Sequence, residues 1–179
     1  MRQPKLPQGM VQVYTGNGKG KTTAALGLAM RAAGRGLKIH VIQFMKGAGP
    51  YGEHIAAERL FPRMQITPTG RAGWVTKGAP EPEDLTEAAM GLETARRSIL
   101  SGGYDMIILD EINGAVDFGL LEVEEVLRLI EERPWHLELV LTGRNVHEKI
   151  AEAADLVSEI QERKHYFRRG VPARVGIEN

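Results

Sequence analysis

The stretch MVQVYTGNGKGKTTAALGLAMRAA, residues 10–33, decides the fold of this chain. Its first five residues predict a short strand, and a glycine-rich run ends that strand at once. The alanines and leucines that follow predict a helix over 21–33, with a glycine C-cap just behind it. The β-branched run over 38–44 predicts a second strand. A strand, a helix and a strand in this order favour a parallel sheet.

The rest of the chain extends this unit. Asp84 as N-cap and Glu87 as its capping-box partner predict a helix that ends at the glycine pair 102–103. The apolar run within 105–110 is typical of a strand buried on both faces of a parallel sheet. Further helices are expected over 53–60, 120–133 and 146–154, and further strands over 64–67, 136–141 and 156–160. The predicted fold class is therefore α/β, a doubly wound, mostly parallel sheet of five or six strands with helices on both faces.

Length and composition indicate one globular domain. The chain has 179 residues, of which 42% are hydrophobic. Residues 1–9 carry prolines and a glycine and are assigned to a flexible N-terminal arm, and residues 10–179 to a single domain. The absence of cysteine excludes disulfides and thiolate chemistry, and 23 basic against 23 acidic residues leave no net field to attract nucleic acid. The apolar runs are far shorter than the roughly 18 residues of a membrane span, and no secretory signal is visible. We expect a cytoplasmic protein with no nucleic-acid or membrane partner.

The run GNGKGKTT, residues 16–23, has the setting of a phosphate loop. It follows a strand and opens a helix, so backbone N–H groups and the helix N-terminus can converge on phosphate oxygens. Lys21 is expected to neutralise a phosphate, and Thr22 to ligate Mg²⁺. The common motif has a glycine where this chain has Thr15, so the loop is a variant, and a glycine-rich turn without a ligand is the competing interpretation. The candidate nucleotide-binding residues are Gly16, Asn17, Gly18, Lys19, Gly20, Lys21, Thr22 and Thr23.

A second set of candidates follows later strands. Asp110 and Glu111 end an apolar strand, and ligands bind at the carboxyl ends of strands in an open parallel sheet. Either carboxylate would complete the shell of a Mg²⁺ ion that also binds phosphates and water, although such a pair alone is more often a solvated turn. Arg144 follows another strand and could reach the phosphates, or be a surface arginine. Together these residues predict a P-loop NTPase-like domain that binds Mg-ATP.

The residues alone leave open what is done with ATP. A small-molecule kinase is one interpretation, and a nucleotide-switched binding module is another, with Phe118 and a loop over 114–119 as its switch segment. The irregular stretch over 45–83 is long for a loop in a compact domain, so we expect substrate contacts there.

A series of short motifs resembles one family. Beside the phosphate loop, the matching runs are VIQFMKG (41–47), LDEI (109–112), TGRN (142–145), ADLVSE (154–159), KH (164–165), GVPAR (170–174) and GIE (176–178). In this order and spacing they are similar to the P-loop corrinoid adenosyltransferases, the ATP:cob(I)alamin type of cobalamin biosynthesis. The phosphate loop by itself is generic, whereas the whole series is specific.

This resemblance implies a reaction. The 5′-deoxyadenosyl group of ATP would move to the Co(I) centre of a corrinoid (cobalamin, cobinamide or cobyrinic acid diamide), and triphosphate would leave. Since Co(I) carries no proton to remove, no general base is needed, and the protein supplies orientation and electrostatics. Lys21 and Glu111 would be the catalytic residues, and Thr22 and Glu111 the Mg²⁺ ligands.

The resemblance also places the corrin over the irregular stretch. Trp74 matches a family tryptophan near the corrin, and Glu53 a family Gly-Glu pair; an anchor that pins a long loop is the other interpretation of Trp74. Family members often carry an aromatic residue at the position of Ala72, where it helps to keep the lower axial ligand off cobalt. Ala72 therefore suggests that another residue has this role, or that the substrate is a corrinoid without the bulky lower ligand. The family further implies a homodimer and an electron donor such as a reduced flavin or flavoprotein.

Overall fold

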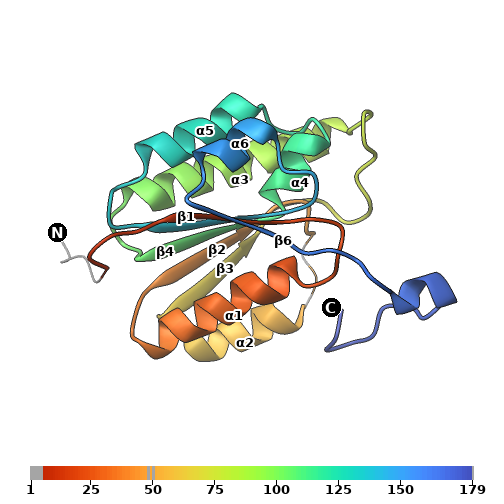
Figure 1. Cartoon of the computed structure of the whole chain (residues 1–179), viewed down its shortest axis with the longest axis horizontal. Coiled ribbons are helices and arrows are strands. Elements are labelled where there is room, and N and C mark those ends of the chain that lie inside the picture. Colours follow the sequence, from red (N-terminus) through yellow and green to blue (C-terminus); the bar gives the residue numbers. More distant parts are fainter. Residues whose placement is uncertain (1–5, 48, 50, 179) are drawn as a thin grey trace.

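One six-stranded parallel sheet forms the centre of the protein (Figure 1). The computed structural model describes residues 6–47, 49 and 51–178. Neighbouring strands are all parallel, in the order β3-β2-β4-β5-β1-β6. The strands are β1 (Val11–Thr15), β2 (Ile39–Gln43), β3 (Met64–Pro68), β4 (Met106–Asp110), β5 (Glu138–Thr142) and β6 (Leu156–Glu159). The predicted fold class is confirmed, with six strands.

Helices cover both faces of the sheet (Figure 1). One face carries α1 (Lys21–Gly34) and α2 (Gly52–Leu60). The other carries α3 (Pro82–Leu100), α4 (Ile112–Asp117), α5 (Val123–Glu132) and α6 (Glu148–Ala153). Beyond β6 the chain leaves these layers, forms the short 3₁₀ helix η1 (Tyr166–Arg169) and returns towards the first turn of α1.

Successive side chains of β4 point into two different hydrophobic cores, one on each face of the sheet. Met106 and Ile108 pack into the cluster that includes the alanines of α1, whereas Ile107 and Leu109 pack into the cluster beneath α3 and α5. Side chains of a strand point to opposite faces in turn, so a strand between two helical layers must be apolar throughout. The same alternation directs Asp110, the last residue of β4, towards the α1 face at the carboxyl edge of the sheet.

The start of α3 differs from the prediction. Asp84 is not the N-cap, and Glu87 is not its capping-box partner: the helix begins at Pro82, Glu81 is the N-cap, and Asp84 Oδ2 accepts the N–H of Glu81 at 2.9 Å. A proline in the first turn costs nothing, because its missing N–H would have no partner there. The error is about one turn, and it arose because Asp84 has the residue type of a cap but occupies the third helical position.

Residues 114–119 were predicted as a loop, and this was wrong. Helix α4 occupies most of them, and its Asn113, Gly114 and Ala115 are buried. Asparagine and glycine are poor helix formers, and a helix of six residues shows no periodicity in the sequence. The helix predicted from residue 120 begins only at Val123, behind a capping box between Glu122 and Glu125.

The N-terminal arm is fixed at its last residue. Gly9 donates its N–H to the carbonyl of Trp135 at 2.9 Å, and its own carbonyl accepts a hydrogen bond from Arg133. A Cβ at Gly9 would lie 2.2 Å from the backbone of Leu137, so this close approach requires glycine. The first five residues of the predicted arm lie outside the described residues. No helix in the described ranges is long and apolar enough to cross a membrane.

Candidate active site

The phosphate loop connects β1 to α1 at the carboxyl edge of the sheet. Lys21 is buried in the first turn of α1, and its ammonium donates to the carbonyls of Gly16 and Gly18 at 2.9 and 3.0 Å. Burial lowers the pKa of Lys21 below its ordinary value, against the attraction of Glu111. The ammonium is therefore held against two carbonyls of the loop, and the backbone N–H groups of such a loop are the groups that bind phosphate oxygens.

The loop is also supported from outside by the chain that follows β6. Gly18 donates its N–H to the carbonyl of Ile160 at 2.7 Å. At Gly16, where φ is 96°, a Cβ would lie 2.5 Å from that same carbonyl oxygen. Thr15, at the position of the missing motif glycine, is the last residue of β1 and lacks the positive φ of its neighbour. The departure from the motif has a structural reason: the turn begins one residue later.

Asp110 lies at the centre of a buried polar network. One carboxylate oxygen accepts hydrogen bonds from the hydroxyls of Thr22 and Thr142, at 2.8 and 2.7 Å. The other accepts one from Gln43 Nε2 at 3.1 Å and lies 3.4 Å from the ammonium of Lys46. Because the Thr22 hydroxyl donates its hydrogen bond to Asp110, its oxygen lone pairs stay free to face a cation.

Glu111 follows at once and is strained. Its φ of 63° is left-handed, and its N–H donates to the Thr142 hydroxyl at 2.9 Å. Burial raises the pKa of the Glu111 carboxyl, as does the neighbouring Asp110, while Lys21, Lys46 and Arg144 oppose the rise. A half-buried carboxylate whose pKa is shifted in this way, at the carboxyl edge of a parallel sheet, is a candidate for a functional role.

Strained backbone marks the same edge of the sheet elsewhere. Among the described residues, three that are not glycine have left-handed φ: Met45, Glu111 and Asn145. They follow β2, β4 and β5 respectively. Such conformations cost on the order of 1–3 kcal/mol each and tend to occur at functional sites. The strain therefore points to the carboxyl edge independently of any motif.

Lys46 connects this network to α2. Its ammonium lies 3.1 Å from Glu53 Oε1, which also accepts a hydrogen bond from Gln43 at 3.2 Å. Burial alone would lower the pKa of Lys46, but Asp110 and Glu53 outweigh it and hold that pKa above its ordinary value. His54 Nε2 lies 2.7 Å from Gln43 Oε1 and completes the chain of contacts. The carboxylates beside it thus keep the Lys46 ammonium charged.

A cavity of about 710 Å³ opens next to this network. Its walls come from the loop after β2, the loop after β3, α4 and the loop after β5. The lining residues are Met45, Lys46, Gly47, Gly49, Tyr51, Arg71, Ala72, Gly73, Trp74, Val75, Glu111, Gly114, Phe118 and Arg144. Aromatic and apolar side chains with a few charged groups are typical of a site for a large organic ligand.

The rim of this cavity is built by two loops in backbone contact. A Cβ at Gly47 would lie 2.7 Å from the carbonyl oxygen of Arg71, and a Cβ at Gly70, where φ is 141°, would lie 2.7 Å from the nitrogen of Lys46. Arg71 binds Asp84 at the start of α3 through two hydrogen bonds of 2.6 and 3.2 Å. Trp74, on the loop so braced, is 94% exposed. A tryptophan that pins a loop would be buried, so the interpretation of Trp74 as an anchor is wrong.

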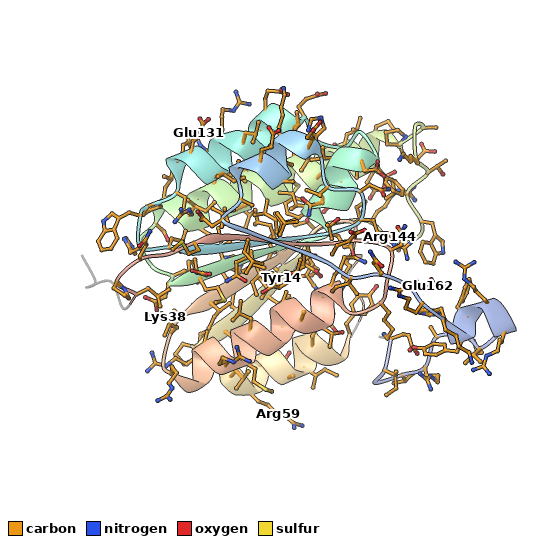
Figure 2. All side chains as sticks on the ribbon, in the orientation of Figure 1. Tyr14, Lys38, Arg59, Glu131, Arg144 and Glu162 are labelled. Carbon is orange, nitrogen blue, oxygen red and sulfur yellow. The ribbon has the colours of Figure 1, made fainter. Side chains whose placement is uncertain are left out.

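A second, polar pocket of about 420 Å³ adjoins the phosphate loop. Asn17 of the loop contributes to it, together with Arg144, Glu162 and Arg168. Figure 2 shows Arg144 and Glu162 at one end of the molecule and Lys38 at the opposite end. Arg144 borders both this pocket and the 710 Å³ cavity, so it lies between the phosphate loop and the larger cavity.

The structure brings most of the predicted site residues together. Residues 16–23 form the loop and the first turn of α1, with Asn17, Lys19 and Thr23 exposed and Lys21 buried. Glu111, Arg144 and Trp74 line the 710 Å³ cavity, as does Ala72. Glu53 does not line it; its carboxylate braces Lys46, which does.

Sequence reasoning missed the residues that support these groups. Lys46, Gln43 and Thr142 were noted only as members of the runs 41–47 and 142–145 and were given no role, although each of them ends or closely follows a strand. Position at the carboxyl end of a parallel strand was the available signal. The hydrogen bonds among these side chains depend on strand order, and the sequence does not contain that order in readable form.

Comparison with known proteins gives a consistent result. The family model for ATP:corrinoid adenosyltransferase BtuR/CobO/CobP matches residues 7–179. The corrinoid adenosyltransferase of Escherichia coli (strain K12) is 40% identical over 171 residues, which cover 96% of this chain and 86% of that protein. Corrinoid adenosyltransferase CobA of Salmonella typhimurium is 40% identical over 177 residues, covering 98% and 88%.

One solved structure has a similar fold. A KaiC-like protein from the hyperthermophilic archaeon Pyrococcus horikoshii superposes with a TM-score of 0.59 over 88% of this chain and 74% of that one. At 18% identity this likeness concerns the fold alone.

Proposed function

Because the chain belongs to the ATP:corrinoid adenosyltransferase family, we propose that its phosphate loop holds the triphosphate of ATP while the 710 Å³ cavity receives the corrinoid. The activity is that of a corrinoid adenosyltransferase in cobalamin biosynthesis. One observation carries the placement of the substrates: Glu111 and Arg144 line the cavity and also lie close enough to Lys21 to influence its pKa. The adenosyl group of ATP and the cobalt of the corrinoid would meet beside these two residues.

On the phosphate side, Lys21 supplies the main positive charge. Its ammonium now binds two neutral carbonyls, and an anionic phosphate oxygen is the stronger acceptor. As the 5′ carbon passes to cobalt, negative charge grows on the leaving triphosphate, and a preorganised ammonium stabilises that charge most where water is excluded. The N–H groups of the loop and of the first turn of α1 act in the same direction.

On the cavity side, the protein orients rather than reacts. A Co(I) corrinoid brings its own electron pair, so the cavity needs no proton acceptor. Trp74 and Phe118 offer flat apolar surfaces to a macrocycle, and Arg144 can face the carboxamide or phosphate edges of a corrinoid. This division of tasks agrees with a cavity lined mainly by aromatic and apolar groups.

The residues present also fit a Mg²⁺ ion. Magnesium takes oxygen ligands and needs only one or two from the protein when phosphates and water supply the rest. The Glu111 carboxylate is half-buried, lines the cavity and accepts no hydrogen bond from another described residue. We assign Thr22 and Glu111 as the protein ligands, with Asp110 orienting the Thr22 hydroxyl. Bound Mg²⁺ would offset charge on the triphosphate.

The homodimer expected from the family remains part of this proposal. All four residues of β6, an edge strand of the sheet, are exposed, and Leu156 and Val157 are 43% and 46% accessible. Exposed edge strands pair readily with other chains, so this edge is a candidate surface for a second copy. Light scattering on the purified protein would give the mass directly, and a monomer at micromolar concentration would contradict the proposal.

The proposal also includes an electron donor and a cellular location. A separate reduced flavin or flavoprotein supplies the electron that brings the cobalt to Co(I), and the enzyme works in the cytoplasm. Activity that rises on addition of a reduced flavoprotein to a Co(II) corrinoid would support the first.

The reaction itself is tested anaerobically. The protein is mixed with Mg-ATP and chemically reduced cob(I)alamin or cobinamide, and the visible spectrum is followed. We expect a light-sensitive Co–C product and one triphosphate released per adenosyl group transferred. Release of ADP instead of triphosphate would indicate phosphoryl transfer and contradict the proposed placement of ATP.

A further inference from the structure

Lys19 of the phosphate loop contacts the C-terminal segment, defined here as residues 164–178. Its ammonium donates to the carbonyl oxygen of Ile177 at 3.2 Å and lies 3.7 Å from Glu178 Oε1. Among the described residues, Lys21, two residues on, donates only to carbonyls of the loop itself. The two lysines therefore differ: Lys21 is held from within the loop, and Lys19 from a part of the chain 158 residues away.

The carboxylate that faces Lys19 is itself fixed. Glu178 accepts hydrogen bonds from the hydroxyl of Tyr166 and from the backbone and guanidinium of Arg174, the last at 3.2 and 3.3 Å. The Arg174 guanidinium also stacks over the Tyr166 ring, 4.8 Å from its centroid. Arg174 and Tyr166 lower the pKa of Glu178 to about 2, so the carboxylate is charged at every pH at which the enzyme would work.

The C-terminal segment reaches the loop by a return path (Figure 1). Directly after β6, the carbonyl of Ile160 accepts a hydrogen bond from Gly18 of the loop. The chain then runs outward through η1 and returns to contact Lys19. The phosphate loop is thus held at two adjacent residues by the same stretch of chain. The proposed adenosyl transfer does not require the contact of Lys19 with Ile177 and Glu178.

The contacts with Ile177 and Glu178 leave N–H donors of the Lys19 ammonium available for an anion. An ammonium has three N–H donors, and within the part of the chain that the structure describes, the carbonyl of Ile177 uses one of them. The 3.7 Å separation from Glu178 is an ion pair but is too long for a hydrogen bond. Since Arg174 already offsets much of the charge on Glu178, the carboxylate restrains the ammonium without saturating it.

We propose that Glu178 is a positioning residue for ATP, which holds Lys19 over the phosphate loop so that its remaining N–H donors meet the triphosphate. The inference rests on the proposed ATP site and deepens it. A free lysine must give up much of its conformational freedom when it binds phosphate, whereas a lysine already held by Ile177 and Glu178 loses less. The C-terminal segment therefore strengthens ATP binding and has no part in the transfer step.

The experiment compares Glu178→Gln with the unmodified full-length enzyme. Mg-ATP binding is measured by calorimetry without corrinoid, and KM for ATP and kcat are measured with saturating reduced corrinoid. We expect Kd and KM for ATP to rise about three- to tenfold, in line with the cost of ordering one long side chain, and kcat to stay the same. The matched control is Glu132→Gln, another carboxylate bound by an arginine, Arg96, on the surface of α5 and far from the loop; it should change neither value.

The same substitution in a second variant, Lys19→Met, distinguishes an effect of Glu178 through Lys19 from a general effect on protein stability. In a Lys19→Met enzyme, Glu178→Gln should cause no further loss of ATP affinity, because the residue through which it acts is gone. An equal loss in both backgrounds, an unchanged KM, or tighter ATP binding would each overturn the inference. If Glu178→Gln does not fold, Lys19→Met by itself tests the same contact: KM for ATP should rise, and an unchanged KM in that variant overturns the inference. Failure of the unmodified enzyme to bind ATP would instead contradict the proposed ATP site.

Discussion

The phosphate side and the cavity side of the candidate active site are built in different ways. On the phosphate side, Asp110 is 1% exposed, and hydrogen bonds from Thr22, Thr142 and Gln43 surround it. On the cavity side, Trp74 is 94% exposed, on a loop that backbone contact supports at its base.

The difference follows from the two kinds of ligand. A triphosphate is small and highly charged, and it is bound best by donors that are already in place, because their ordering then costs nothing at binding. A corrinoid is large and mostly flat, and exposed aromatic side chains gain their contacts only when it arrives. We therefore expect variants on the phosphate side to lose catalysis, and variants on the cavity side to change corrinoid affinity and choice.

The largest effect is expected for Lys21→Ala. Loss of the buried ammonium removes the principal positive charge at the leaving triphosphate, and kcat/KM for adenosylation should fall by at least about 100-fold. The measurement is the anaerobic formation of the Co–C product. Lys149→Ala is the control, since Lys149 pairs with Glu124 on the surface and should be neutral. Retained activity in Lys21→Ala would contradict the assignment of the whole loop.

Glu111→Gln should separate catalysis from stability. Burial raises the pKa of Glu111 in the folded protein, so the folded state keeps a proton that the unfolded state has lost. Stability therefore falls as pH rises from the ordinary pKa through the raised one, and the charged carboxylate is a cost above it. The glutamine has no such cost, so we expect a higher free energy of unfolding at pH 8, little change at pH 4, and activity reduced about tenfold or more.

Chemical denaturation at the two pH values measures the first effect, and product formation at saturating Mg-ATP measures the second. If Glu111→Gln is no more stable than the unmodified protein at pH 8, burial does not set the pKa of this carboxyl. The same follows if the difference in free energy of unfolding between the two proteins is equal at pH 4 and pH 8. Activity equal to that of the unmodified enzyme would remove Glu111 from the proposed magnesium site.

On the cavity side, Gly70→Ala should act on the corrinoid alone. Its φ of 141° is unfavourable for alanine, and the new Cβ would lie 2.7 Å from the nitrogen of Lys46, so the two rim loops must separate. We expect KM for the corrinoid to rise about tenfold while ATP affinity changes less than about twofold. Gly102→Ala is the control at a second positive φ, 66°, with no neighbour within 4 Å, and it should leave KM unchanged. Equal effects of the two variants would show that strain alone matters and that the loops need not touch.

The same contrast explains how much could be predicted. The phosphate side is local in sequence: residues 16–23 and the Asp110–Glu111 pair each carry a residue pattern whose chemistry is recognisable without a structure. The cavity side depends on contacts between distant loops. No pattern in the sequence indicates that Gly47 lies on Arg71, or that Asp84 binds Arg71 instead of capping α3 alone.

The same limit applies to α4 and Glu53. Helix α4 has too few residues to show periodicity, although Gly114 and Phe118 from it and its C-cap line the cavity. Glu53 was assigned to the corrin through resemblance, and its position in the structure depends on a hydrogen bond to Lys46 that joins two elements. In both cases the information lies in tertiary packing, which overrides local pattern.

The smallest effect is expected for Ala72→Phe, and it concerns which corrinoid is preferred. Ala72 is exposed and lines the cavity two residues before Trp74, so a phenylalanine there adds an aromatic surface without displacing a packed neighbour. If that surface helps to keep the bulky lower ligand off cobalt, it should favour cobalamin over cobinamide, which lacks the ligand. An aromatic contact contributes about 0.5–1.5 kcal/mol, so the ratio of kcat/KM for cobalamin to that for cobinamide should rise about threefold. Ala79→Phe is the control, since Ala79 is exposed on the same irregular stretch but does not line the cavity. A ratio that stays constant while both rates change would mean that position 72 affects the rim as a whole, and that Tyr51 or Phe118, which also line the cavity, is the better candidate for the role of the missing aromatic.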